Sequence, residues 1–234
     1  MILRRLTDAL RKQDWFTVVI ETLIVVFGVF IGLQVNNWND GARDRSKEAI
    51  VLEQLAREFT STVEAAKTAQ VDAEVLLTAT RDVLRVIRDG KEPEDKAAFL
   101  QTLGRAGGFE PGPSEPVTLT ELMTAGGLSE LSSPDLRTAL IRYHENADHQ
   151  RELARLILQR VSAPHDGFHD AIHVNPDFDP ALGNRLDDYD WDLMPGTRQQ
   201  FQTIMYGKLG LSYGIEEQID RGEAVLAEIE KVRK

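Results

Sequence analysis

The sequence contains no cysteine and carries no excess of positive charge. The absence of cysteine excludes disulfide frameworks, thiolate metal sites and cysteine nucleophiles. The chain has 27 Lys and Arg residues against 38 Asp and Glu residues, and 33 of the acidic residues lie in the range 46–234. A domain with this charge does not attract phosphate backbones. Nucleic acid is therefore not an expected partner.

Sequence motifs of the common enzyme classes are also missing. The chain has no His-Glu-x-x-His zinc motif, no Walker motif and no nucleophile elbow. Gly207, Gly210 and Gly214 recur near the C-terminus, but no strand is predicted before them, so close helix packing is favoured over phosphate binding. These absences favour a protein without catalytic activity of its own and without a cofactor.

The chain does have one long hydrophobic run. Residues 16–33 are apolar apart from Thr17, Thr22 and the single charge of Glu21, and a run of this length suffices for a transmembrane helix. A buried core helix and a cleaved signal peptide are the alternatives, although no small-x-small cleavage site follows the run. We expect three parts: an amphipathic cytoplasmic segment (1–14), a transmembrane helix (15–38) and a helical soluble domain (45–234).

The charges beside the apolar run indicate its orientation. Four basic residues precede the run, and three follow it closely: Arg4, Arg5, Arg11 and Lys12, then Arg43, Arg45 and Lys47. Because basic residues are enriched on the cytoplasmic side of a membrane, the N-terminus is predicted to be cytoplasmic. The large domain would then lie on the opposite side, and membrane lipid would surround the helix.

One face of the apolar helix carries small and polar residues. At 100° per residue, five of them fall close to one line: Glu21, Gly28, Gly32, Asn36 and Asn39. Gly28 and Gly32 form a GxxxG pattern, which lets two helix backbones approach closely. A carboxyl group in hydrocarbon costs on the order of 2.5–3.5 kcal/mol, which favours a partner for Glu21.

This pattern predicts a helix–helix interface, either within a homo-oligomer or with another membrane protein. Two alternatives remain open. Glu21 could reach the membrane surface while the glycines are incidental, or Glu21 could carry protons in an oligomeric membrane complex.

The rest of the chain reads as all-α. Residues 45–89 contain no proline or glycine, and apolar or small residues recur at heptad spacing. The seam comprises Leu52, Leu55, Phe59, Thr62, Ala66, Ala69, Ala73, Leu76, Thr80, Val83 and Ile87. Further helices are predicted over 96–106, 119–124, 134–162 with an extension or restart through 174, and 197–232. No strand is predicted, and the helices suggest a bundle of roughly four-helix type.

Two stretches resemble a known family. Residues 23–39, which end in Leu-Gln-Val-Asn-Asn-Trp-Asn, resemble the N-terminal anchor of a bacterial family catalogued only as a domain of unknown function. Residues 121–143 resemble its second block, with a Glu-Leu…Gly-x-Leu…Leu-Arg-x-x-Leu…Tyr pattern. The resemblance implies a single-pass protein of the bacterial inner membrane. It implies no activity and no catalytic residue.

The second block has a structural interpretation and a functional one. In the structural interpretation, Gly126 and Gly127 end one helix and Ser133 caps the next. In the functional interpretation, Arg137 and Tyr143 line a ligand groove. The sequence favours the structural interpretation.

Histidines and acidic residues gather in a short part of the chain. His165, His169 and His173 are spaced i, i+4 and i+8, which places them on one face if a helix continues past Pro164. Such histidines could share a divalent metal ion. The acidic segments 175–179 and 187–192 could bind calcium through their oxygens, although they lack the pattern of an EF-hand loop.

Two functions therefore follow from the sequence. The first is a membrane-anchored, non-enzymatic helical domain that acts through partners, as a periplasmic sensor or as an accessory subunit of a membrane complex. The alternative is a metal-binding protein or metal-dependent enzyme that uses His165, His169 and His173.

Overall fold

The computed structural model describes residues 15–161, 167–177 and 186–233, and side chains are described for these residues except 15–18, 33, 35–37, 39, 40 and 42. The chain divides into two compact units, which we call the N-terminal unit (1–50) and the C-terminal unit (51–234). Helix α2, Trp15–Asp89, contributes residues to both units. Each unit is described separately below.

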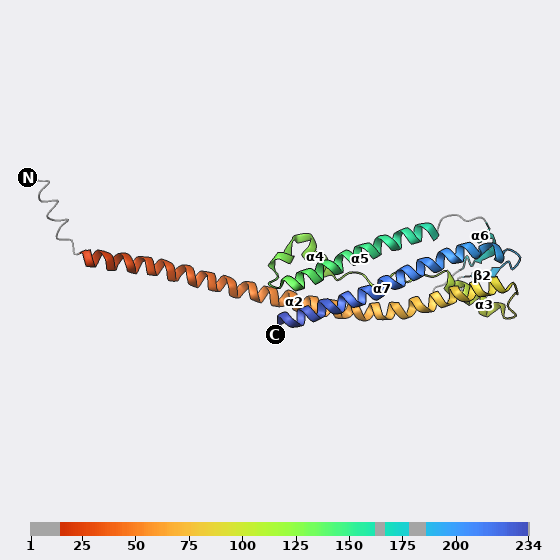
Figure 1. The fold of residues 1–234 in the computed structure, drawn as a ribbon, viewed down its shortest axis with the longest axis horizontal. Helices are drawn as coiled ribbons and strands as arrows, with labels where there is room; N and C mark the ends of the chain where they lie inside the picture. Colours follow the sequence, from red (N-terminus) through yellow and green to blue (C-terminus); the bar gives the residue numbers. More distant parts are fainter. Residues whose placement is uncertain (1–14, 162–166, 178–185, 234) are drawn as a thin grey trace, which may run out of the picture. The chain divides into compact units, whose positions relative to one another are not determined.

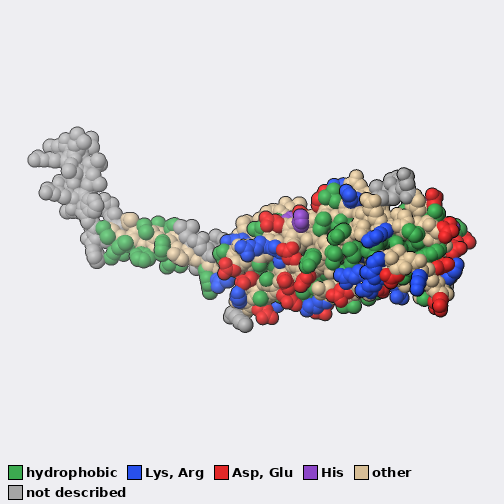
Figure 2. Space-filling view, turned by 45° about the vertical axis from the view of Figure 1, so that its right-hand side comes forward, with side chains coloured by type: hydrophobic (Ala, Val, Ile, Leu, Met, Phe, Trp, Pro, Cys, Tyr) green, Lys and Arg blue, Asp and Glu red, His purple; other side chains and the backbone are tan. Residues whose placement is uncertain are grey.

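The described part of the N-terminal unit is helical and has an apolar surface. Ten large hydrophobic side chains between Val19 and Ile31 have exposed fractions between 39% and 66%. Figure 2 shows hydrophobic side chains covering this part of the chain. Among the described residues, no helix combines the length and the hydropathy of a membrane span.

Three long helices form the C-terminal unit. They are the 51–89 part of α2, α5 (Pro134–Val161) and α7 (Arg198–Arg233), which lie side by side in Figure 1. Between them the chain forms α3 (Lys96–Ala106), α4 (Val117–Ala125) and η1 (Gly127–Glu130). The described residues are mostly helical, which confirms the predicted fold class at this level.

The three long helices agree with the long helices that the sequence predicts over 45–89, 134–162 and 197–232. The described part of the unit has three, because the proline- and glycine-rich segment 107–116 separates α3 from α4 and keeps both short. The predicted seam of α2 is confirmed at most positions. Val63 and Leu77 are buried in place of Thr62 and Leu76, because a helix of 3.6 residues per turn drifts from a strict heptad.

One end of the unit contains a small sheet, which the sequence did not predict. Helix α6 (Phe168–Ala171) leads into strand β1 (Ile172–Val174), which pairs antiparallel with β2 (Leu186–Tyr189). The predicted helical continuation through residue 174 is therefore wrong. Two β-branched residues in β1 favour the extended backbone, and Tyr189 opposite Ile172 completes the pair.

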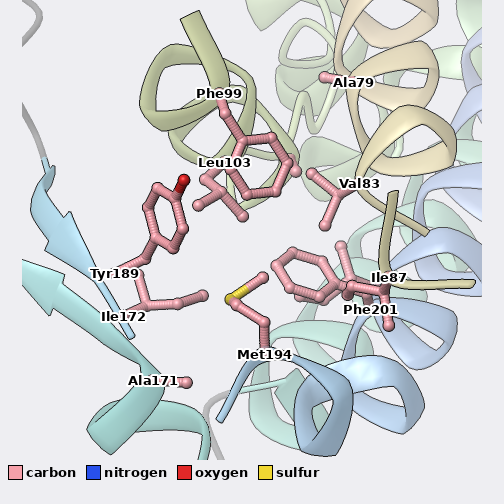
Figure 3. Close-up of a cluster of buried hydrophobic side chains, with 12 residues drawn as sticks. Ala79, Val83, Ile87, Phe99, Leu103, Ala171, Ile172, Tyr189, Met194 and Phe201 are labelled. Carbon is pink, nitrogen blue, oxygen red and sulfur yellow. The ribbon is translucent and has the colours of Figure 1, made fainter. Parts of the chain in front are cut away.

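The sheet closes a hydrophobic core at this end of the bundle. In Figure 3, Tyr189 lies beside Phe99 of α3, and Met194 lies beside Phe201 of α7. The rings of Phe99 and Tyr189 meet edge to face with centroids 5.1 Å apart. Helix η2 (Met194–Thr197) leads from the sheet into α7.

One acidic side chain of α2, Glu58, forms hydrogen bonds to the first turn of α4, which also packs on α2 through Leu119. Glu58 accepts a hydrogen bond from the backbone N–H of Thr118 at 2.9 Å and another from the Thr118 hydroxyl at 2.8 Å. Burial alone would raise the pKa of the Glu58 carboxyl, but these bonds, together with Gln54 and Arg57, lower its pKa. Glu58 thus serves as the N-terminal cap of α4, whose own preceding residue, Pro116, makes no side-chain cap.

Candidate functional site

The residues of the predicted membrane interface all lie on α2. Glu21, Gly28 and Gly32 are exposed, and a Cβ atom added at either glycine would meet no atom within 4 Å. The described face around the two glycines is therefore open. Asn36 and Asn39 belong to the same helix, but their side chains lie outside the described residues.

The two residues of the predicted ligand groove are engaged separately within the fold. Arg137 donates to the backbone oxygen of Leu131 at 2.8 Å. Tyr143 is 1% exposed, packs edge to face on Phe59, and its hydroxyl accepts a hydrogen bond from Gln218 at 2.9 Å. Burial raises the pKa of Tyr143 to about 12. These contacts support the structural interpretation of both residues.

The structure does not stack the histidines of the predicted metal site on one helix. His169 lies in α6, His173 lies in β1, and His165 lies outside the described residues. The Nε2 atom of His173 is 3.2 Å from the backbone oxygen of Asp170. Within the ranges that the structure describes, no three His, Cys, Asp or Glu side chains gather in a metal-binding group.

Each of the two predicted calcium segments contains an ordinary turn where it is described, and residues 187–189 of the second segment belong to β2. Asn175 accepts a hydrogen bond from the backbone N–H of Asp177, and Asp190 accepts one from that of Asp192. Such side-chain-to-backbone bonds two residues apart are typical of Asx turns. Residues 178–185, which separate the segments, lie outside the described residues.

A different site appears where the loop before α4 crosses α5. A pocket of about 610 Å³ lies there, walled by residues 111–115 on one side and by the 144–154 face of α5 on the other. Gln218 of α7 and Thr120 of α4 complete the wall. The backbone at Gly112 has a φ of 80°, which suits glycine in this turn.

The chemistry of this pocket centres on Glu115, His144 and Asp148. The Glu115 side chain is 4% exposed, and its Oε1 lies 2.7 Å from Nδ1 of His144. The other ring nitrogen of His144, Nε2, lies 3.5 Å from Oδ2 of Asp148. One imidazole thus stands between a buried carboxylate and an exposed one, because the Asp148 side chain is 51% exposed.

Two further side chains contact these acids. The Thr120 hydroxyl donates to Oε2 of Glu115 at 3.3 Å. Arg151 donates to Oδ1 of Asp148 at 2.5 Å, and its other terminal nitrogen lies 3.9 Å from Glu115. The pocket therefore holds two acids, one guanidinium and one imidazole.

Sequence reasoning missed this pocket for a physical reason. Glu115 lies within a Pro- and Gly-rich loop, and 29 positions separate it from His144, so no local period connects them. Only the i, i+4 spacing of His144 and Asp148 on α5 was visible in the sequence.

A buried lysine lies elsewhere in the C-terminal unit. Lys208 of α7 is 4% exposed, and its ammonium group contacts four oxygen atoms from α2 and α3. Burial lowers the pKa of Lys208 to about 7. Two of the oxygens, those of Arg105 and Ala106, belong to the last two residues of α3, and the Arg105 oxygen also accepts from the backbone N–H of Gly108.

No family model, curated protein or solved structure matches this chain in the comparisons made. The resemblance of residues 23–39 and 121–143 to a bacterial membrane family stays a prediction from the sequence.

Proposed function

We propose that this protein is a membrane-anchored, non-enzymatic helical domain that acts through protein partners. Residues 16–33 would lie in the bilayer, and the C-terminal unit would be a sensor or an accessory subunit. The observation that carries this proposal is the exposure of ten large hydrophobic side chains between Val19 and Ile31.

Those side chains surround the helix apart from the narrow face of Glu21, Gly28 and Gly32. They include consecutive residues, Ile24 to Phe27 and Val29 to Ile31. A helix that is apolar all round needs lipid or other helices as its surroundings, because each Å² of apolar surface left in water costs roughly 25 cal/mol. The full run of residues 16–33 has the length of a bilayer core.

The residues that flank the apolar run indicate the orientation of the membrane helix and the compartment of the C-terminal unit. The basic segment before the run favours a cytoplasmic N-terminus. In a bacterial inner membrane, the C-terminal unit would then be periplasmic. The acidic composition of that unit also argues against its lying flat on an anionic lipid surface.

The face of Glu21, Gly28 and Gly32 supports association of this helix with another one. Both glycines are free of neighbours, so a second helix backbone can approach there. A second copy of this chain and a different membrane protein are both compatible with the pattern.

The first test is the behaviour of the full-length chain in cells. We expect it to sediment with membranes and to stay there after alkaline carbonate treatment. Release into the supernatant by carbonate would contradict the membrane span.

The second test compares two substitutions one helical position apart. Gly28→Leu fills the proposed contact, whereas Val29→Leu changes a side chain about 100° away and serves as the control. In mild detergent, we expect Gly28→Leu to reduce the mass of the complex or to lose the co-purified protein, while Val29→Leu retains both. Equal masses and equal composition for the two variants would reject this interface.

A further inference from the structure

The pocket between residues 111–115 and α5 has a pattern of hydrogen-bonding groups that points to a ligand. The pocket lies in the C-terminal unit, so its chemistry does not depend on whether residues 16–33 enter a membrane.

The buried Glu115 fixes the tautomer of His144. An ionised carboxylate only accepts hydrogen bonds, so the nitrogen 2.7 Å from it, Nδ1, must carry a proton. In a neutral imidazole the other nitrogen, Nε2, is then an acceptor. A carboxylate that orients a histidine in this way is a common arrangement in binding sites, because it leaves Nε2 available to a ligand.

The available nitrogen faces another acceptor. Nε2 of His144 lies 3.5 Å from Oδ2 of Asp148, and neither atom can donate to the other while the imidazole is neutral. Arg151 satisfies Oδ1 of Asp148, the other carboxylate oxygen. Two acceptors this close can both bond to one donor nitrogen, because N–H···O and N–H···N bonds need only about 2.8–3.0 Å each.

The walls of the pocket suit an organic group attached to such a donor. Pro111, Pro113, Ala147 and Ala154 supply apolar surface beside the two acceptors. The volume of about 610 Å³ lies within the usual range for small-molecule sites.

We propose that this pocket binds a small organic cation, whose ammonium group donates to Nε2 of His144 and to Asp148 while its alkyl part lies against the proline and alanine side chains. The positive charge of the ligand also balances the second acid of the pocket, since Arg151 is a single cation facing both Glu115 and Asp148.

The test uses the full-length chain in mild detergent and calorimetric titration with three probes of the same chain length. They are n-butylammonium, butan-1-ol and butyrate, which differ only in charge and donor groups. We expect n-butylammonium alone to bind at pH 7.5. Asp148→Asn is expected to weaken binding at least tenfold, and Asp72→Asn on the exposed face of α2 serves as the matched control.

Several outcomes would overturn the proposal. They are an absence of binding by n-butylammonium, or equal binding in Asp148→Asn and wild type. Binding of butyrate in place of the amine would assign the pocket to anions through Arg151 and protonated His144. Because Asp148 is half exposed, circular dichroism of Asp148→Asn should match wild type and exclude misfolding as the cause.

Discussion

At the scale of single residues, the buried ammonium of Lys208 is the most unusual group in the described structure. It lies 2.8–3.2 Å from the oxygens of Leu76, Thr80, Arg105 and Ala106. No carboxylate is among these four partners, so backbone and hydroxyl dipoles compensate the charge, together with the ring of Phe109, whose centroid lies 5.6 Å away. Lys208 also adds a donor to the carbonyl groups at the end of α3, where Arg105 already accepts from the backbone N–H of Gly108.

The lowered pKa of Lys208 predicts a specific pH dependence of stability. The folded pKa is about 7 and the ordinary value is 10.5, so between these values the unfolded chain binds one more proton. The free energy of unfolding therefore rises with pH in this window, by at most about 1.4 kcal/mol per pH unit from this group. We expect urea titrations of the full-length chain at pH 6.5, 8 and 9.5 to show the rise.

Substitution isolates the contribution of this lysine. Lys208→Met should flatten the rise with pH, because it removes the side chain that loses its proton on folding in this window. Lys67→Met, which removes an exposed lysine, is the control and should keep the rise. If Lys208→Met kept the same slope as wild type, the assignment of the slope to Lys208 would be wrong.

At the scale of elements, glycines decide how closely α7 approaches its neighbours. A Cβ atom at Gly207 would lie 2.7 Å from Ile157 of α5, and one at Gly222 would lie 2.6 Å from Val63 of α2. At Gly210 the nearest atom, in Leu153, would be 3.7 Å away, which is an ordinary contact. The prediction of close helix packing agrees with the structure at Gly207 and at Gly214, where a Cβ atom would clash with Gln150 of α5, but Gly210 leaves room for a side chain.

Alanine substitutions should separate the two kinds of glycine. Helix propensity alone favours alanine over glycine by about 1 kcal/mol. Gly210→Ala should therefore be neutral or stabilising, whereas Gly207→Ala and Gly222→Ala should destabilise by about 1–3 kcal/mol because the helices must move apart. Thermal unfolding followed by circular dichroism at 222 nm measures all three, and equal effects at the three sites would contradict the packing argument.

At the scale of the whole molecule, the hydrophobic core belongs to the C-terminal unit. The buried residues of its three hydrophobic clusters all lie at position 52 or later in the chain. A fragment of residues 45–234 should therefore keep its fold without the apolar segment.

Expression of that fragment tests the division of the chain. We expect a soluble, cooperatively unfolding helical protein, whereas the full-length chain should require detergent to remain dispersed. A fragment that is unfolded by circular dichroism would show that the N-terminal unit contributes to the core. If the full-length chain stayed monomeric in plain buffer, the exposed hydrophobic side chains between Val19 and Ile31 would need another explanation.

The sequence by itself determined the helices, because their signals are local. Hydrophobic spacing, the run without proline or glycine over 45–89, and Pro134 at the start of a helix all act within a few residues. The predicted bounds of 96–106 agree with α3, and the predicted helix over 197–232 agrees with α7 within one residue. The apolar run of residues 16–33 is likewise a property of the sequence alone.

Only the tertiary structure decided which distant side chains meet. Three contacts join residues that no helical or strand periodicity of the sequence connects. They are the pairing of β1 with β2, the cap that Glu58 provides for α4, and the contacts of buried Lys208. The same holds for Glu115 and His144, whose contact depends on how a loop crosses a helix. Local patterns reflect the backbone geometry of one element, whereas a site is formed when several elements pack together, and that packing is a property of the complete fold.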